Sequence, residues 1–391
     1  MVSRTVLVRP TADFDSFDAV YRLAFGERAI SLRSRYFNVP LLALIVDEDS
    51  QLVTLPTLYL AECARNGRSV TGDTVRSYAE ALQSWLRFLE ASRTDLRAVT
   101  EDDFAIFRNQ IVHRGAARNS RPWSSATANH RISVVCSFHL WGEKTGLLQT
   151  NLGSFLKARA DERAGRGRFH MKDGRRSANS LAPTVLQRLP RPLSLDELRL
   201  IFQAARQPYR LIFKWALVTG LRRFEICNLN TFQLPSPQQL ALSSDGFVQI
   251  NVLRKGARDV TVHVPFRLVE DTHWYILTER KKIMKYEGTK IFLNAYGTPL
   301  DRRSVTREFR RCADSIGVNA TLHHLRHTFA LNVLRILERH TNNGEPLNSV
   351  KTLQVLLGHS SLESTEIYLR AMAMSSDPVM EALGYLYGAA T

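Results

Sequence analysis

The sequence is poor in cysteine and has no long apolar segment, and these absences exclude several classes of protein. Its four cysteines are scattered without metal-ligand spacing, so we expect neither structural zinc nor disulfides. They are Cys63, Cys136, Cys227 and Cys312. The longest apolar run covers only residues 39–46, which is too short to span a bilayer. Residues 1–15 lack the apolar core of a signal peptide, so we expect a cytoplasmic protein of the bacterial cytosol or nucleoid.

Acidic residues are also scarce relative to basic ones. The chain has 37 Asp and Glu against 53 Lys and Arg, which gives a formal net charge of +16. Such an excess indicates a polyanionic partner, and nucleic acid is the first candidate. A membrane surface is the alternative, but the basic residues are spread along the chain instead of flanking an apolar segment. The 391 residues suffice for two or three domains of about 150 residues each.

Four polar residues near the C-terminus interrupt an otherwise apolar helical pattern. His323 and Arg326 lie three residues apart, so at the start of a helix they project from one face. His359 follows a glycine at which one helix is expected to end, and it precedes a Ser-Ser pair that caps the next. Tyr368 lies about two and a half helical turns further on. This set offers a cationic phosphate ligand, two groups that titrate near neutrality and a phenolic nucleophile.

A second arginine and a basic hairpin lie upstream of these residues. Residues 219–222 read Thr-Gly-Leu-Arg, and Glu225 follows Arg222 by three positions. Apolar residues alternate over 248–252 and again over 260–264, which predicts a β-hairpin with Lys255 at its tip.

Together these motifs resemble the tyrosine recombinases, or phage integrases. The catalytic domain of that family carries an Arg in a Thr-Gly-Leu-Arg turn, a Lys in a β-hairpin, His-x-x-Arg, a His in Leu-Gly-His, and a Tyr about nine residues later. All five elements occur here in that order. The resemblance covers roughly residues 55–375 and is strongest over about the last 190 residues.

Two arginines are expected to bind the phosphodiester that this family cleaves. Arg222 and Arg326 would each donate in a fork to phosphate oxygens, which become more negative as a nucleophile adds. Removing such a donor typically costs about 3 kcal/mol of transition-state stabilisation. Glu225 is expected to orient Arg222, and a plain salt bridge between these two residues is the alternative.

The resemblance also assigns the nucleophile and the groups that move protons. Tyr368 would attack phosphorus, leaving a 3′-phosphotyrosyl link and a free 5′-hydroxyl, and Lys255 would protonate the departing 5′-oxygen. His323 would act on the tyrosine proton as base and later as acid, while His359 would donate a hydrogen bond to a phosphate oxygen. We expect His327 to be a packed, hydrogen-bonded histidine. This scheme needs no metal, nucleotide or other cofactor.

The expected fold is mostly α with a small β-sheet. It combines a helical core-binding domain with an α-rich catalytic domain, closed on DNA as a C-shaped clamp. We expect five segments: an N-terminal extension 1–52, a core-binding domain 53–156, a basic linker 157–191, a catalytic domain 192–376 and a C-terminal tail 377–391.

The three flanking segments each leave two interpretations open. In the extension, a helix over 13–25 and a hairpin of 41–46 with 51–54 predict a structural or protein-contact role, with accessory DNA binding as the alternative. The linker is expected to contact phosphates, although a solvated loop is also compatible with its composition. The tail is expected to dock on a neighbouring protomer, and local packing is its alternative.

Within the two domains, helix starts and apolar periods are clear. A helix begins within 71–74, a capping box lies at 100–103, and another helix covers about 125–141. In the second domain a capping box lies at 194–197, an apolar helix at 211–218 and a basic helix at 304–313. Arginines expected to contact DNA are Arg76, Arg131, Arg166, Arg168, Arg175, Arg176, Arg254, Arg258 and Arg307.

The function expected from the resemblance is site-specific DNA recombination, in the integration, excision or transposition of a mobile element. The partners expected are double-stranded DNA carrying specific sites, further copies of the chain in a tetramer, and accessory proteins. A type IB topoisomerase shares the same chemistry and is one alternative. A DNA-binding protein that has lost catalysis is the other.

Overall fold

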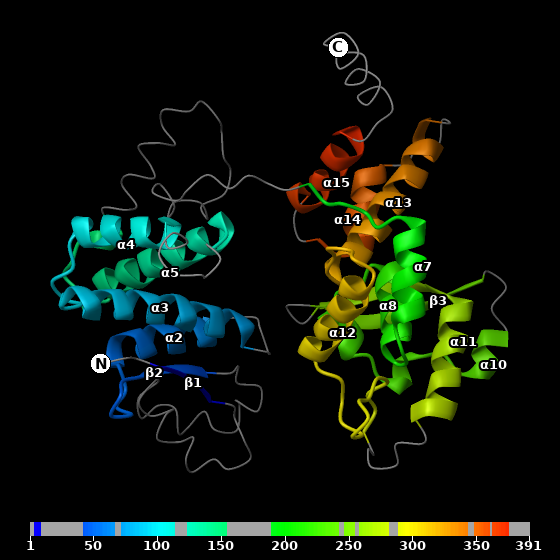
Figure 1. Cartoon of the computed structure of the whole chain (residues 1–391), viewed down its shortest axis with the longest axis horizontal. Coiled ribbons are helices and arrows are strands. Elements are labelled where there is room, and N and C mark those ends of the chain that lie inside the picture. Colours follow the sequence, from blue (N-terminus) through cyan, green and yellow to red (C-terminus); the bar gives the residue numbers. More distant parts are fainter. Residues whose placement is uncertain are drawn as a thin grey trace, which may run out of the picture. The chain divides into compact units, whose positions relative to one another are not determined.

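The structure is a computed structural model that describes residues 4–8, 42–66, 72–113, 123–154, 189–241, 246–254, 258–280, 288–342, 348–359 and 362–374 (Figure 1). The chain separates into two compact units, Met1–Leu186 and Gln187–Thr391. Both units are rich in helix and each contains a two-stranded antiparallel sheet. The expectation of a mostly α fold with little β structure is therefore confirmed.

The first unit consists of a helical bundle and one strand pair. Its elements are β1 (Arg4–Val8), β2 (Leu42–Val46), α2 (Thr54–Asn66), α3 (Asp73–Ser92), α4 (Glu101–His113) and α5 (Ser125–Lys144). Helix α3 packs against α2, α4 and α5, and Trp85 on α3 is completely buried. The capping box expected at 100–103 is present, because Thr100 N–H donates to Asp103 Oδ2 at 2.9 Å and Asp103 N–H donates to Thr100 Oγ1 at 3.4 Å.

The strand pairing near the N-terminus differs from the hairpin expected within 41–54. Strand β2 pairs with β1, in the register Arg4↔Val46 to Val8↔Leu42. The expected hairpin is present only as its turn, with an antiparallel bridge between Val46 and Leu52 and hydrogen bonds from Asp47 N–H to Gln51 O at 2.9 Å and from Val53 N–H to Ile45 O at 2.8 Å. It extends no further because the chain enters α2 at Thr54. The helix expected over 13–25 lies outside the described residues.

The β2 strand also belongs to the core of the first unit. All five of its residues are buried, and Ile45 lies in one apolar cluster with residues of α2, α3 and α5. An apolar run without alternation is typical of a strand covered on both faces.

The buried histidine of this unit, His139, is held by two hydrogen bonds. Trp85 Nε1–H donates to His139 Nε2 at 3.1 Å, and His139 Nδ1 lies 3.2 Å from Thr150 Oγ1. Because Nε2 accepts from the indole, the ring is neutral and its Nδ1–H donates to the threonine. Burial lowers the pKa of His139 to about 4.

We predict that acid destabilises the first unit through His139. In the unfolded chain His139 is protonated below its ordinary pKa of 6.5, whereas in the folded chain it stays neutral down to about pH 4. The free energy of unfolding therefore falls as the pH falls across that window. The loss is at most about 3 kcal/mol. Urea unfolding of the full chain at about pH 7 and about pH 5, followed by tryptophan fluorescence, measures it.

A non-titrating variant separates this effect from the other groups. His139→Gln should unfold with a smaller difference between the two pH values than the wild type. The exposed His130 on the same helix provides the matched control, and His139→Gln should reduce the difference more than His130→Gln does. An undiminished difference in His139→Gln would contradict the prediction.

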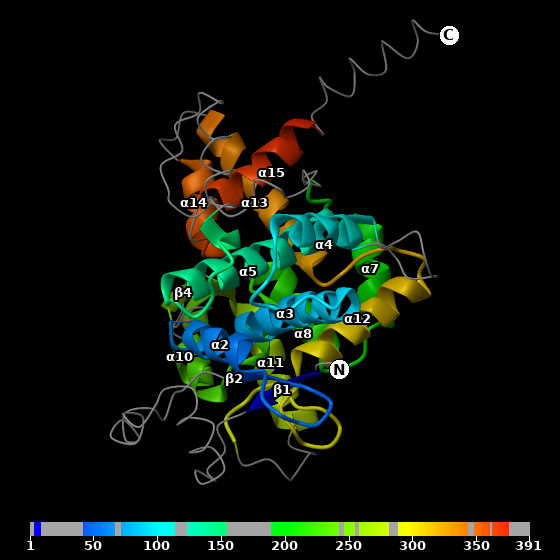
Figure 2. The same cartoon turned by 90° about the vertical axis from the view of Figure 1, so that its left-hand side faces the viewer.

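The second unit is built from α7 (Leu195–Ala204), α8 (Tyr209–Thr219), α9 (Arg223–Cys227), η3 (Thr231–Gln233), α10 (Pro237–Ala241), β3 (Phe247–Arg254), β4 (Arg258–Pro265), α11 (Phe266–Tyr275), η4 (Ile276–Arg280), α12 (Arg302–Ser315), α13 (His323–Asn342), α14 (Ser349–Leu357) and α15 (Glu363–Met374). Its main apolar core contains Trp215 of α8 and Phe309 of α12. Helices α13, α14 and α15 form a smaller apolar cluster of their own and lie side by side in both views (Figures 1 and 2).

The hairpin predicted in this unit is present. Strands β3 and β4 are antiparallel, with the pairs Val248↔Val264, Ile250↔Val262 and Val252↔Val260. Ile250, Val252, Val262 and Val264 are buried in the main core. The alternation therefore marks the face that packs inward, as the sequence predicted.

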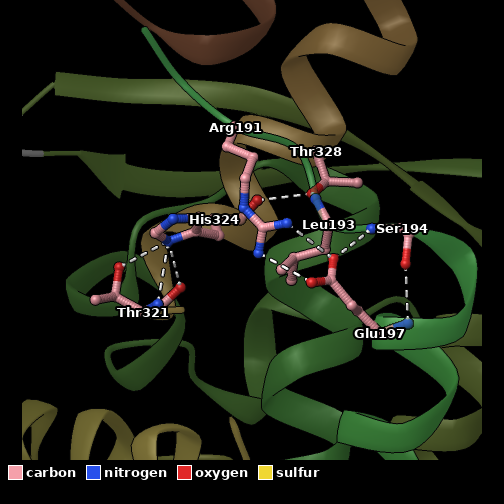
Figure 3. Close-up of polar contacts among 7 residues, drawn as sticks. All are labelled: Arg191, Leu193, Ser194, Glu197, Thr321, His324 and Thr328. Carbon is pink, nitrogen blue, oxygen red and sulfur yellow. Dashed lines mark hydrogen bonds and ion pairs between the residues drawn. The ribbon is translucent and has the colours of Figure 1, made fainter. Parts of the chain in front are cut away.

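The segment entering the second unit is fixed to α7 and α13 (Figure 3). Ser194 and Glu197 form the predicted capping box of α7, and Arg191 pairs with Glu197 at 2.9 Å. Leu193 N–H donates to Thr328 Oγ1 on α13 at 2.8 Å. Leu200 on α7 is 47% exposed, because it lies about 200° around the helix from the buried Leu198.

Candidate active site

Three of the motifs meet at one buried guanidinium. Arg326, on the first turn of α13, is 2% exposed. It donates from Nη1 to the carbonyl oxygen of Gly220 and from Nη2 to that of Leu357 at 2.8 Å. Gly220 ends α8 in the Thr-Gly-Leu-Arg segment, and Leu357 ends α14 just before His359. One side chain therefore connects the three segments that carry the candidate arginines and histidines.

Both helix ends use glycine for the same reason. Gly220 caps α8 with a φ of 64°, and Gly358 caps α14 with a φ of 61°. Residues with a Cβ are sterically strained in this left-handed conformation, whereas glycine is not. At Gly220 a Cβ would also lie 2.5 Å from Cδ1 of Phe329, a contact too short to keep without displacing the ring. Phe329 is on α13, one turn beyond Arg326.

Arg222 is held at the start of α9 by Glu225. The Glu225 carboxylate accepts from the Arg222 backbone N–H at 2.8 Å and from Nη1 of its guanidinium at 3.2 Å. Glu225 is buried, whereas the Arg222 side chain is 35% exposed. The expected contact is thus present, and the guanidinium still reaches solvent beyond it.

His323 opens α13 beside both arginines. His323 is an exposed residue, but partial desolvation of its ring and then the positive charges of Arg326 and Arg222 lower its pKa to about 4. The imidazole is therefore neutral at neutral pH. Its ring centroid lies 4.4 Å from that of His327, one helical turn on.

The hydroxyl of Tyr368 contacts His327. Tyr368 is on α15 and 2% exposed, and its oxygen lies 3.0 Å from Nδ1 of His327. Burial raises the pKa of Tyr368, although the charges of Arg326 and Arg222 act in the opposite direction. The prediction that His327 is packed and hydrogen-bonded is confirmed, and its partner is the candidate nucleophile itself.

His359 lies beside the Tyr368 ring. Its Nδ1 is 2.9 Å from Oγ1 of the buried Thr365, which fixes the direction of the imidazole. The rings of His359 and Tyr368 are stacked, with centroids 6.4 Å apart and an interplanar angle of 10°. Thr365 was not predicted from the sequence as a site residue.

The remaining predicted residues divide into three groups. Lys255 lies outside the described residues, as do Arg166, Arg168, Arg175 and Arg176, and only the backbone of Arg254 and Arg258 is described. On α5, Arg131 stacks over Trp123 at 3.7 Å and donates to Ser84 Oγ. Arg76 on α3 is half-buried, and Arg307 on α12 is exposed.

Sequence reasoning missed the contact between His327 and Tyr368. The available signal was the spacing of four residues between His323 and His327, which places both rings on one face of α13. Nothing local in the sequence indicated which of the two would reach α15.

No group of histidine, cysteine, aspartate or glutamate within the described ranges could hold a metal ion. Likewise, no helix in the part of the chain that the structure describes is long and apolar enough to cross a membrane.

Family models match both units of the chain. The model of the phage integrase family matches residues 191–374, and that of the phage integrase N-terminal SAM-like domain matches residues 59–146. Together they cover more than two thirds of the sequence. The chain belongs to the phage integrase family of tyrosine recombinases.

Relatives of this tyrosine recombinase support the assignment. The chain is 30% identical over 195 residues to tyrosine recombinase XerC 2 of Ralstonia nicotianae, a match that covers 48% of this chain and about half, 51%, of that relative. It is 27% identical over 321 residues to tyrosine recombinase XerC of Rhodospirillum centenum, covering 77% of this chain and 78% of the relative. The fold is similar to that of the XerH site-specific recombinase in a post-cleavage complex with its difH substrate, with a TM-score of 0.55, 19% identity and 84% of each chain covered.

We predict that Gly220→Ala destabilises the second unit more than Gly246→Ala. Both glycines have a positive φ, of 64° and 69°, so both substitutions cost about 1–2 kcal/mol in backbone strain. Only at Gly220 does the new Cβ meet Phe329, because nothing lies within 4 Å of a Cβ at Gly246. This contact should lower the free energy of unfolding of Gly220→Ala by about 1–3 kcal/mol beyond that of Gly246→Ala. Urea unfolding of the two variants measures the difference, and equal destabilisation would contradict the account.

Proposed function

We propose that this tyrosine recombinase is a site-specific DNA recombinase that cuts and rejoins DNA strands through a 3′-phosphotyrosyl intermediate. The observation that carries the proposal is the convergence at Arg326, which connects the segments bearing Arg222 and His359 to the helix that contacts Tyr368. A cation pair beside a phenol is suited to attack on a phosphodiester. The formal net charge of +16 favours the DNA that such an attack requires.

The two arginines bind the non-bridging oxygens of the scissile phosphate. Arg222 is oriented by Glu225 and its guanidinium is partly exposed, so it makes the first contact. Arg326 is oriented by two backbone carbonyls, and once the helices around it shift to admit the phosphate, its guanidinium stabilises the charge that develops there. Each donor lowers the barrier by about 3 kcal/mol.

Covalent chemistry begins at Tyr368. Its oxygen forms a bond to phosphorus as the bond from phosphorus to the 5′-oxygen breaks, and Lys255 supplies the proton that the departing oxygen needs. The resemblance assigns the tyrosine proton to His323, as base and later as acid, and assigns to His359 a hydrogen bond donated to a phosphate oxygen. The reverse reaction with the 5′-hydroxyl of another strand rejoins the DNA without an external energy source.

Recombination sets the number of copies that must assemble. Each chain contributes one nucleophile, and exchange between two duplexes breaks four strands, so the active assembly is a tetramer on two recombination sites. The core-binding domain 53–156 and the linker 157–191 contact each duplex, and the tail 377–391 contacts a neighbouring protomer. Integration or transposition of a mobile element in a bacterial cytosol, with accessory proteins setting direction, is the biological role that fits.

Capture of covalent DNA tests the proposed function directly. The wild type and a Tyr368→Phe control are expressed in cells that hold a random-sequence DNA library. Each protein is purified under denaturing conditions, and the DNA that remains covalently attached to it is sequenced. We expect a recurring junction with the wild type and no attached DNA with Tyr368→Phe. Adducts without sequence preference would indicate a topoisomerase, and the absence of any adduct would contradict the proposal.

A further inference from the structure

The hydroxyl of Tyr368 has a histidine as its hydrogen-bond partner in this structure, and it is not the histidine that the sequence suggested. Tyr368 extends from α15 to α13, where its oxygen lies 3.0 Å from Nδ1 of His327. Among the described residues, no hydrogen bond joins His323 to Tyr368, and His323 instead packs its ring against that of His327 at 4.4 Å. General-base catalysis requires such a hydrogen-bond distance to the proton that is removed.

We propose that His327 is the catalytic base that accepts the Tyr368 proton, while His323 acts at the phosphate. The inference rests on the proposed function and adds one catalytic residue to it. In the step, the Tyr368 O–H bond breaks, its proton passes to Nδ1 of His327, and the phenol oxygen forms the bond to phosphorus. The 5′-oxygen leaves with a proton from Lys255, and the proton on His327 returns to Tyr368 when the strand is rejoined.

The surroundings keep both groups in the protonation states that this step needs. Burial and then the neighbouring His323, His324 and Arg326 lower the pKa of His327 to about 3, so its ring is neutral. The proposed step uses the tautomer with the proton on Nε2, in which the Nδ1 lone pair faces the phenol. Burial also raises the pKa of Tyr368, so the phenol retains its proton until attack. The nucleophile is therefore uncharged in the absence of DNA.

DNA binding should raise the pKa of His327, which makes it a stronger base. A base with so low a pKa is weak, but a phosphodiester at Arg222 and Arg326 brings a negative charge that offsets the positive charges around His327. The pKa of His327 then rises towards the working pH, where a general base is most effective. The base becomes competent only when the substrate is in place.

The adjacent His324 supplies a matched control. It lies on the same helix turn, with its ring 5.9 Å from that of His327, but its Nδ1 accepts from the backbone N–H of Thr321 at 3.1 Å (Figure 3). It makes no hydrogen bond to Tyr368 within the described residues. His324→Asn therefore perturbs the same segment without touching the nucleophile.

The test measures single-turnover formation of the covalent adduct by the full chain. The probe is a duplex oligonucleotide carrying the captured junction, made with oxygen or with sulfur at the scissile 5′-bridging position. Sulfur leaves without protonation, so Lys255→Ala should recover on that probe. In His327→Ala and His327→Asn the rate of adduct formation should fall about 100-fold or more on both probes, because the missing group removes the proton from the nucleophile and does not act on the leaving group. His324→Asn should stay within a few-fold of the wild type.

The pH profile separates a base from a structural residue. The titratable and charged groups around the pair are His323, His324 and Arg326 on α13, His359 after α14 and Arg222 at α9, and they are unchanged in the His327 variants. Without His327, hydroxide must remove the phenol proton, so adduct formation should rise about tenfold per pH unit from about pH 7 to about pH 9. The wild type should change far less. Added imidazole should restore part of the rate of His327→Ala.

Three results would overturn the inference. His327→Asn at the wild-type rate would show that no proton passes to this residue. Recovery of His327→Ala on the sulfur probe would place its proton at the leaving group. A steep pH profile in His323→Asn but not in the His327 variants would assign the base to His323. Wild-type adduct formation tests the proposed function separately, and equilibrium unfolding with DNA binding verifies that each variant folds.

Discussion

Arg326 carries a positive charge that is 2% exposed and is bound by the carbonyl oxygens of Gly220 and Leu357. Both oxygens lie at helix C-termini, where the helix dipole is negative, so the ends of α8 and α14 compensate the cost of burying the charge. An arginine can bridge two such ends because its donors form a rigid fork, which a lysine lacks. The site's geometry follows from this bridge, since Arg222 comes two residues after Gly220 and His359 two residues after Leu357.

The packing of α13, α14 and α15 around Arg326 also buries Tyr368 away from solvent. Tyr368 is as buried as Arg326, in the apolar cluster that α13, α14 and α15 share. A phosphodiester needs contact with both side chains, so the proposed function requires these helices to shift when DNA binds. Before DNA binds, burial raises the pKa of Tyr368, so its phenol stays protonated and hydrogen-bonded to His327. The nucleophile is therefore protected from reacting in the absence of substrate.

Local patterns in the sequence were enough to predict most of the elements but few of the contacts between them. The hairpin of β3 and β4 and the capping boxes at Thr100 and Ser194 depend on residues within one element or turn, and these predictions were confirmed. The pairing of β2 with β1 and the contact of His327 with Tyr368 join segments about 40 residues apart, so no local period indicates them. The chemical roles of the six predicted catalytic residues stay predictions, with Lys255 outside the described residues.

Hydrogen exchange in an Arg326→Lys variant tests the central claim that one guanidinium couples the segments around Gly220 and Leu357. In the wild type, Arg222 N–H is bound to Glu225 at 2.8 Å and His359 N–H to the carbonyl of Gln354 at 3.0 Å. The account predicts that both amides lose protection together in Arg326→Lys and keep it in the exposed control Arg307→Lys. Loss at only one segment, or at neither, would contradict it.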